Sequence, residues 1–372
     1  MSKSETIRAV IFKDSKMSNL DEIQKKVNNS KVTIEEKINF NKDFKKIAES
    51  LPNSDKTLYY SWNKTQPINS IQYDSPEGEI IPVSYLKAEI CLEISSQQKY
   101  DKTRMNILPK DKRVDKKNIT VMFLSAMGGC YCLIFTGNDT YFRRCLKLIT
   151  ETTKSGLEIS RLDRQIFTWL FFVNDSVKRN ITKLVSVADI EGFVGTLQDD
   201  DLSLSVPNLE YPNKITGNAQ RLSKMFVTKA FISLGYKFTG VQIELKMKKE
   251  DKNISNANTG MKNVREVPVY DTVEVSFDEE KTIKLTNNGS NITTYYSSEG
   301  KVENAVLYIY SLLFPLIIET YNTKKDMFMN ELPIYSAKLG KEVIDKIVSK
   351  NPSVALLNQN DIKKELDQNI VN

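Results

Sequence analysis

A glutamate and a lysine two residues apart form the pattern in this sequence that comes closest to a catalytic motif. The segment 239–247 has the composition of a β-strand, and strand alternation places Glu244 and Lys246 on the same face. A carboxylate in this position can help to hold Mg²⁺, while the lysine orients the attacking water. The pair is therefore a candidate for metal-assisted hydrolysis.

The second carboxylate of such a site would come from the strand predicted over 182–195, which carries Asp189 and Glu191. In these few residues the sequence resembles the PD-(D/E)XK nucleases. The resemblance implies a Mg²⁺-dependent nuclease with Glu244, Lys246 and Asp189 as catalytic residues. The sequence departs from the usual pattern of that family because a full predicted helix separates Asp189 from Glu244. The other interpretation is an exposed ion pair on a strand face.

The absence of histidine removes several classes of chemistry. The 372 residues include none, which excludes Ser-His-Asp and Cys-His catalysis, imidazole metal sites and imidazole acid–base catalysis. The four cysteines lack the C-x-x-C spacing of a zinc site, and we interpret them as reduced, buried thiols. The three acids at 199–201 predict a solvated turn. No phosphate-binding glycine motif is present, so no cofactor is expected except Mg²⁺ in the nuclease alternative.

Two lysine-rich segments are the main indication of an anionic partner. Residues 99–117 lack apolar periodicity and predict a basic surface loop, and residues 246–265 carry a second group of lysines around a predicted mobile loop. Such segments bind phosphate backbones by releasing counterions. Neither interleaves aromatic residues as base-stacking surfaces do, and a solvated surface is the other interpretation. The predicted nucleic-acid contacts are Lys110, Lys112, Arg113, Lys116, Lys117, Lys248, Lys249 and Lys252.

The overall charge is compatible with such a partner. There are 53 basic against 47 acidic residues, a net charge of +6 with a pI near 8.8. We expect a nucleic-acid-binding accessory protein in a larger assembly, with the lysine-rich segments as its contact surface. The Lys- and Asn-rich composition is typical of an AT-rich genome and fits a phage-defence or mobile-element system. The alternatives are the Mg²⁺-dependent nuclease and a protein-interaction scaffold that binds no nucleic acid.

The sequence also predicts a cytoplasmic protein without a membrane partner. The first residues are polar and charged, and no apolar segment of the signal-peptide type follows them. The longest apolar run, 306–318, is interrupted by Ser311 and Pro315 and is shorter than the ~20 residues that span a bilayer.

The order of the predicted elements indicates an α+β fold with two domains, 1–154 and 155–372. Predominantly antiparallel sheets are expected to pack on buried helices. Thr33 and Glu36 form a capping-box pattern that predicts a helix reaching Ser50. The predicted strands are 6–12, 57–62, 68–73, 79–95, 119–124, 130–135, 182–195, 239–247, 267–277, 281–286 and 291–297. The other predicted helices are 139–154, 158–180, 217–234, 302–321 with a kink at Pro315, 338–350 and 360–370.

Overall fold

The computed structural model describes most of the chain and divides it into two units. The described residues are 4–14, 17, 19–75, 79–101, 103, 105–126, 128–176, 180–196, 212–216, 226–248, 270–286 and 301–351. Unit 1 comprises Met1–Leu162 and Met247–Leu316, and unit 2 comprises Asp163–Lys246 and Ile317–Asn372. The predicted continuous domain 155–372 differs from this division, because residues 247–316 return to unit 1.

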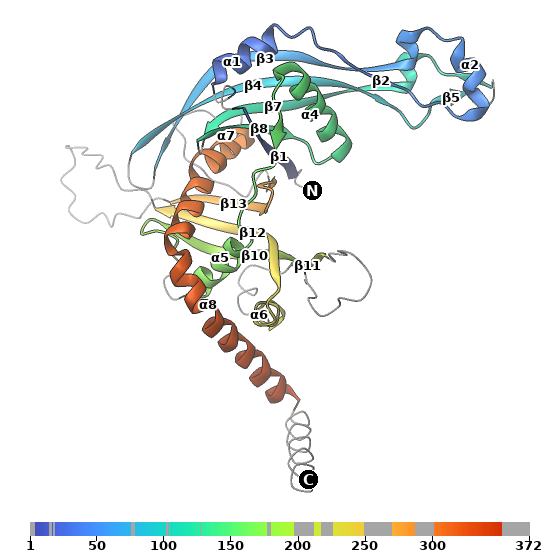
Figure 1. The fold of residues 1–372 in the computed structure, drawn as a ribbon. Coiled ribbons are helices and arrows are strands. Elements are labelled where there is room, and N and C mark those ends of the chain that lie inside the picture. The colour runs from blue at the N-terminus through green and yellow to red at the C-terminus, as the bar shows by residue number, and fades with distance from the viewer. Residues whose placement is uncertain are drawn as a thin grey trace, which may run out of the picture. The chain divides into compact units, whose positions relative to one another are not determined.

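Unit 1 is built on one antiparallel sheet, labelled in Figure 1. The strands lie in the order β13-β14-β1-β8-β7-β4-β3-β2, and the two-residue strand β9 (Leu157–Glu158) also pairs with β1. Their bounds are β1 Ser4–Phe12, β2 Ile34–Lys37, β3 Thr57–Asp74, β4 Ile80–Ser95, β7 Val114–Ala126, β8 Gly129–Phe135, β13 Tyr270–Asp278 and β14 Ile283–Thr286. This sheet and the helices on it confirm the expected α+β fold.

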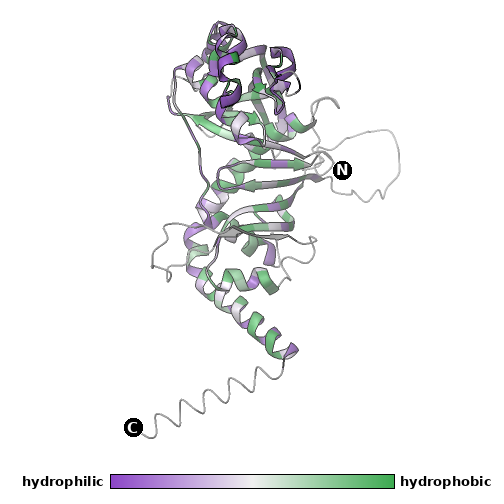
Figure 2. Ribbon diagram, turned by 90° about the vertical axis from the view of Figure 1, so that its right-hand side faces the viewer, coloured by the Kyte–Doolittle hydropathy of each residue, from purple (hydrophilic) through white to green (hydrophobic). Residues whose placement is uncertain are grey.

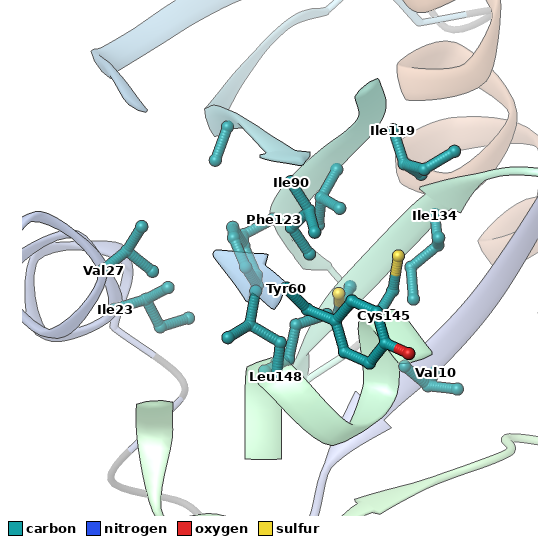
Figure 3. Close-up of a cluster of buried hydrophobic side chains, with 14 of the residues drawn as sticks. Val10, Ile23, Val27, Tyr60, Ile90, Ile119, Phe123, Ile134, Cys145 and Leu148 are labelled. Carbon is teal, nitrogen blue, oxygen red and sulfur yellow. The ribbon is translucent and has the colours of Figure 1, made fainter. Parts of the chain in front are cut away.

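Two helices cover one face of the unit 1 sheet. They are α1 (Leu20–Asn28) and α4 (Asp139–Thr153). Each begins at an asparagine whose side chain accepts a backbone N–H of the first turn, Asn19 from Asp21 and Asn138 from Tyr141. Apolar residues of both helices meet alternate residues of the strands in one buried cluster, shown in Figure 3. The period of 2 in the strands and about 3.6 in the helices produces this shared core.

The opposite face of the sheet packs against α7 (Lys301–Tyr308) and the π-helical segment Ile309–Leu313. The ring of Tyr308 lies 5.1 Å from that of Tyr73, edge to face, and the ring of Tyr310 lies 6.1 Å from that of Tyr131. The π-helical segment immediately precedes Pro315. Since proline has no N–H to donate to the preceding turn, the widened turn is the local form taken by the predicted kink.

In the described part of unit 2, three strands combine with helices. The strand order is β11-β10-β12, with bounds β10 Val185–Thr196, β11 Pro212–Thr216 and β12 Lys237–Lys248. The helices are α5 (Gln165–Asp175), α6 (Phe226–Ser233) and the larger part of α8 (Phe314–Lys350). Tilted rings fill the core: the ring of Phe193 lies 4.5 Å from that of Phe238 and 5.7 Å from that of Phe171.

The C-terminal helical run is longer than predicted. α8 continues to Lys350 with Pro333 in its interior, where two separate helices were expected. By length and composition alone the run Val302–Lys350 could cross a membrane, but 56% of its most apolar window is buried. The core helix of a globular protein passes the same test, and the expected absence of a membrane partner remains a prediction.

Several predicted elements differ from the structure. The predicted helix 33–50 is instead the strand β2 followed by two short helices, Lys42–Phe44 and α2 (Lys45–Glu49). The predicted loop 99–117 contains the two-stranded pair β5 (Tyr100–Asp101) and β6 (Asn106–Ile107), the helical turn α3 (Lys110–Arg113) and the start of β7. The predicted strand 291–297 and helix 360–370 lie outside the described residues.

Candidate nucleic-acid interface

The nuclease residues predicted from the sequence lie on two neighbouring strands of unit 2. Glu244 and Lys246 are on β12, and Asp189 is on β10, the next strand in the sheet. The ammonium of Lys246 is 3.9 Å from the Glu244 carboxylate, and both side chains are partly exposed. This confirms the prediction that the two residues share a strand face. Their contact is the surface ion pair of the second interpretation, of a kind worth ~1 kcal/mol or less.

The carboxylates around this pair have hydrogen-bond partners in the protein. Asp189 accepts the backbone N–H of Ile190 at 2.7 Å, and Glu191 accepts the side-chain amide of Gln242 on β12. Within the described ranges, no group of three or more Asp, Glu, Cys or His residues could hold a metal ion. The nuclease hypothesis therefore remains a prediction without a described metal site. The acidic turn 199–201 lies outside the described residues.

The first lysine-rich segment folds into an end lobe, which we define as residues 37–56 and 99–117. Figure 1 shows α2, β2 and β5 together at the far end of the long β3–β4 ribbon. The lobe has a small apolar core of Phe44, Ala48 and Ile107. The rings of Phe44 and Tyr100 stack 4.2 Å apart, and the Tyr100 hydroxyl accepts the N–H of Asn41 at 2.6 Å. These contacts join two segments separated by more than forty residues.

Arg113 lies inside the lobe, which changes its predicted role. Its side chain is 1% exposed, its Nε donates to the Leu108 carbonyl at 2.8 Å, and an Nη donates to the Asp55 carbonyl. The guanidinium also lies 5.5 Å from the Phe40 ring. A group enclosed in this way holds the lobe together and is not exposed for contact with phosphate.

Lys110 is also engaged within the protein. Its ammonium pairs with Glu93 at 2.9 Å, donates to the Ser54 carbonyl at 3.0 Å and lies 4.5 Å from the centre of the Tyr59 ring. The side chain is 22% exposed. Lys110 therefore fixes α3 against the sheet more than it presents a free charge.

The remaining predicted lysines of this segment are exposed. Lys112 lies within α3, and Lys116 and Lys117 follow on β7, where their side chains point to opposite faces of the strand. Three further exposed lysines come from the other segment of the lobe: Lys42, Lys45 and Lys46. None of the six has an ion-pair partner among the described residues. The sequence analysis did not single out the second group, which falls within the segment predicted as one helix reaching Ser50.

The net positive charge of the end lobe is larger than that of the whole chain. Residues 37–56 and 99–117 contain 13 Lys and Arg against 6 Asp and Glu, a net charge of +7, whereas the complete chain carries +6. Figure 2, turned so that this end faces the viewer, shows predominantly hydrophilic residues on its short helices. The positive charge of the protein is therefore concentrated in one small structural element.

The second lysine-rich segment is described only at its beginning. Lys248 is the last residue of β12 and is exposed, whereas Lys249 and Lys252 lie outside the described residues.

No protein-family model matches this chain, and no curated protein matches its sequence.

Proposed function

We propose that this protein binds the phosphate backbone of nucleic acid through the end lobe, as an accessory protein of a larger assembly. The observation that carries the proposal is the convergence of two groups of exposed lysines, from segments far apart in the sequence, on one lobe with its own core. The apolar core of the lobe joins the two segments that carry these charges. Closely spaced positive charges release several counterions at once when they meet a polyanion.

The nature of the exposed side chains indicates which feature of the nucleic acid is bound. Lysine ammonium groups act as point charges on phosphate, whereas base recognition requires stacking rings or bidentate donors. The stacked Phe44 and Tyr100 rings pack within the lobe, and the one arginine that the structure describes there, Arg113, is buried. We therefore expect binding with little dependence on base sequence.

Direct binding to short labelled nucleic acids tests this proposal. Fluorescence anisotropy would compare the wild-type chain with a lobe variant that carries Lys112→Ala, Lys116→Ala and Lys117→Ala. Each lysine that contacts phosphate contributes about one unit to the salt slope, and the loss of three should weaken binding at low salt by at least about tenfold. Duplex DNA, duplex RNA and single strands would be titrated separately.

The matched control removes three exposed lysines elsewhere in unit 1: Lys31→Ala, Lys64→Ala and Lys147→Ala. This variant has the same net charge as the lobe variant. It should bind almost as well as the wild type, because the change in net charge is equal and only the position differs. Equal weakening in both variants would show non-specific attraction to a basic protein. An absence of binding at low salt would refute the proposal and favour a protein partner.

A further inference from the structure

A polar cavity of about 390 Å³ lies in unit 1, away from the end lobe. It is formed where β1 and β14 pair beside the first turn of α4. The lining includes Thr6 and Arg8 of β1 and Lys284 of β14. Thr6 and Lys284 are directly opposite each other in the register, and Arg8 lies two residues along from Thr6 on the same face. The volume is at the lower end of the range for small-molecule sites.

One wall of the cavity is a guanidinium held in a fixed position. Arg8 pairs with Asp139 at 2.5 Å, donates to the Gly137 carbonyl at 3.3 Å and lies 5.0 Å from the Phe142 ring. Its side chain is 24% exposed, which leaves it within reach of a ligand. Because three contacts already fix the group, a ligand would lose little conformational entropy in engaging it.

The opposite wall is the tight turn between β13 and β14. The Asp278 carboxylate accepts the N–H of Glu280 at 3.0 Å and that of Thr282 at 2.8 Å. Lys281, in the left-handed conformation at φ 57°, turns its ammonium away into the protein. There it donates to the Tyr131 hydroxyl at 3.0 Å and to the Ser160 hydroxyl at 2.8 Å. The turn is therefore rigid, as a preorganised binding wall should be.

The charges that line the cavity are unequally compensated. Arg8 is paired with Asp139, and Glu280 is paired with Arg161 at 3.1 Å. Lys284 is exposed and has no ion-pair partner in the part of the chain that the structure describes. Asp278 is the remaining acid; its carboxylate accepts two backbone N–H groups of the turn, and burial raises its pKa. The available charge is thus the ammonium of Lys284 beside a fixed guanidinium.

We infer that this cavity binds the anionic group of a small molecule, a carboxylate or a phosphate, between Lys284 and Arg8. The hydroxyls of Thr6 and Thr282 line the same cavity and can donate to the remaining oxygens. A hydroxyl group next to the anion would complement Asp278 as an acceptor. The ligand class is therefore a small hydroxy acid or a small phosphate compound, and the site is independent of the nucleic-acid surface.

Isothermal titration calorimetry of the full chain with two probes tests the inference and separates the two sources of the anion. Lactate supplies a carboxylate with a neighbouring hydroxyl, and inorganic phosphate supplies a phosphate. Choline chloride at the same ionic strength serves as the cationic reference. At least one anion should bind with saturation, and Lys284→Gln should weaken that binding by tenfold or more, because a charge-assisted contact is lost.

The control variant is Lys117→Gln, an equal change of charge in the end lobe. It should leave anion binding unchanged, while Lys284→Gln should leave nucleic-acid binding unchanged, so that failure of one proposal is distinguishable from failure of the other. Thermal melts check that both variants are folded. Lys284→Gln should fold normally, because the Lys284 side chain is exposed. The inference would be overturned if neither anion showed saturable binding, or if both variants weakened anion binding equally.

Discussion

The assignment of Arg113 to a structural role makes a quantitative prediction. Replacing it by methionine keeps a long side chain over Phe40 and removes the charge together with the donors to the Leu108 and Asp55 carbonyls. Hydrogen bonds from charged groups contribute about 1.5–3 kcal/mol each, and a cation–π contact about 0.5–1 kcal/mol. The desolvation of the guanidinium offsets part of this gain, as does one buried Nη without a partner. We expect a net loss of about 2–3 kcal/mol.

The loss should be local because the end lobe has a core separate from that of the main sheet. Hydrogen exchange of the Arg113→Met protein should show faster exchange in residues 37–56 and 99–113, with little change in β8 and α4. The matched control is Lys112→Met. That neighbouring side chain is exposed, and its replacement should change stability by no more than about 0.5 kcal/mol.

The reasoning would be refuted by the opposite pattern. If Arg113→Met left exchange in the lobe unchanged and weakened nucleic-acid binding as much as Lys112→Met does, Arg113 would be a contact residue. If exchange became faster throughout the protein, the lobe would not be an independent folding element.

Three further outcomes follow from buried groups in unit 1. Tyr310→Phe should destabilise the protein by about 1–3 kcal/mol in urea unfolding, because the Tyr310 hydroxyl donates to the carbonyl of Lys281 and both residues are buried. Burial raises the pKa of Asp278 above its ordinary value, which makes the folded state bind more protons than the unfolded state. The free energy of unfolding should therefore fall as the pH rises from about 4 through the raised pKa. The stability of Asp278→Asn relative to wild type should accordingly be higher at pH 7 than at pH 4. An equal stability difference at both pH values would contradict this. A thiol reagent should label at most Cys91 in the folded protein and all four cysteines after unfolding, because the other three are buried and burial raises their pKa. Rapid labelling of two or more thiols in the folded protein would contradict the described packing.

The parts of the fold that local patterns dominate could be predicted from the sequence. The apolar runs around Gly128 and Gly129 predict the β7–β8 hairpin, and Gly128 has the positive φ of 74° that such a turn favours. The helix predicted over 139–154 is confirmed as α4, whose C-cap Lys154 has the left-handed conformation. The strand over 6–12 is confirmed as β1.

Where distant contacts decide the structure, local patterns misled. The capping-box pattern from Thr33 predicts a helix, but Ile34 is buried and pairs with Tyr60 in the sheet. Glu36 accepts the hydroxyl of Tyr60 and pairs with Arg144 at 2.9 Å instead of capping a helix. These partners come from positions that no local window includes. Tertiary contacts therefore override the helical signal.

The candidate sites show the same limit. Composition identified the lysine-rich segment 99–117, but only the fold shows that Arg113 is enclosed and that Lys42, Lys45 and Lys46 join the same lobe. The cavity between β1 and β14 was not anticipated. Its lining comes from β1, from the start of α4 and from the hairpin between β13 and β14, and these segments lie far apart in the sequence.

The salt dependence of DNA affinity tests the central claim most directly. The association constant of a short duplex would be measured over a range of salt concentrations for the wild type and for the variant in which Lys112, Lys116 and Lys117 are alanine. If these lysines contact phosphates, the log–log slope of the variant should be less steep by about 2–3 than that of the wild type. The Lys31, Lys64 and Lys147 control should keep the wild-type slope. Equal slopes for wild type and lobe variant would contradict the account.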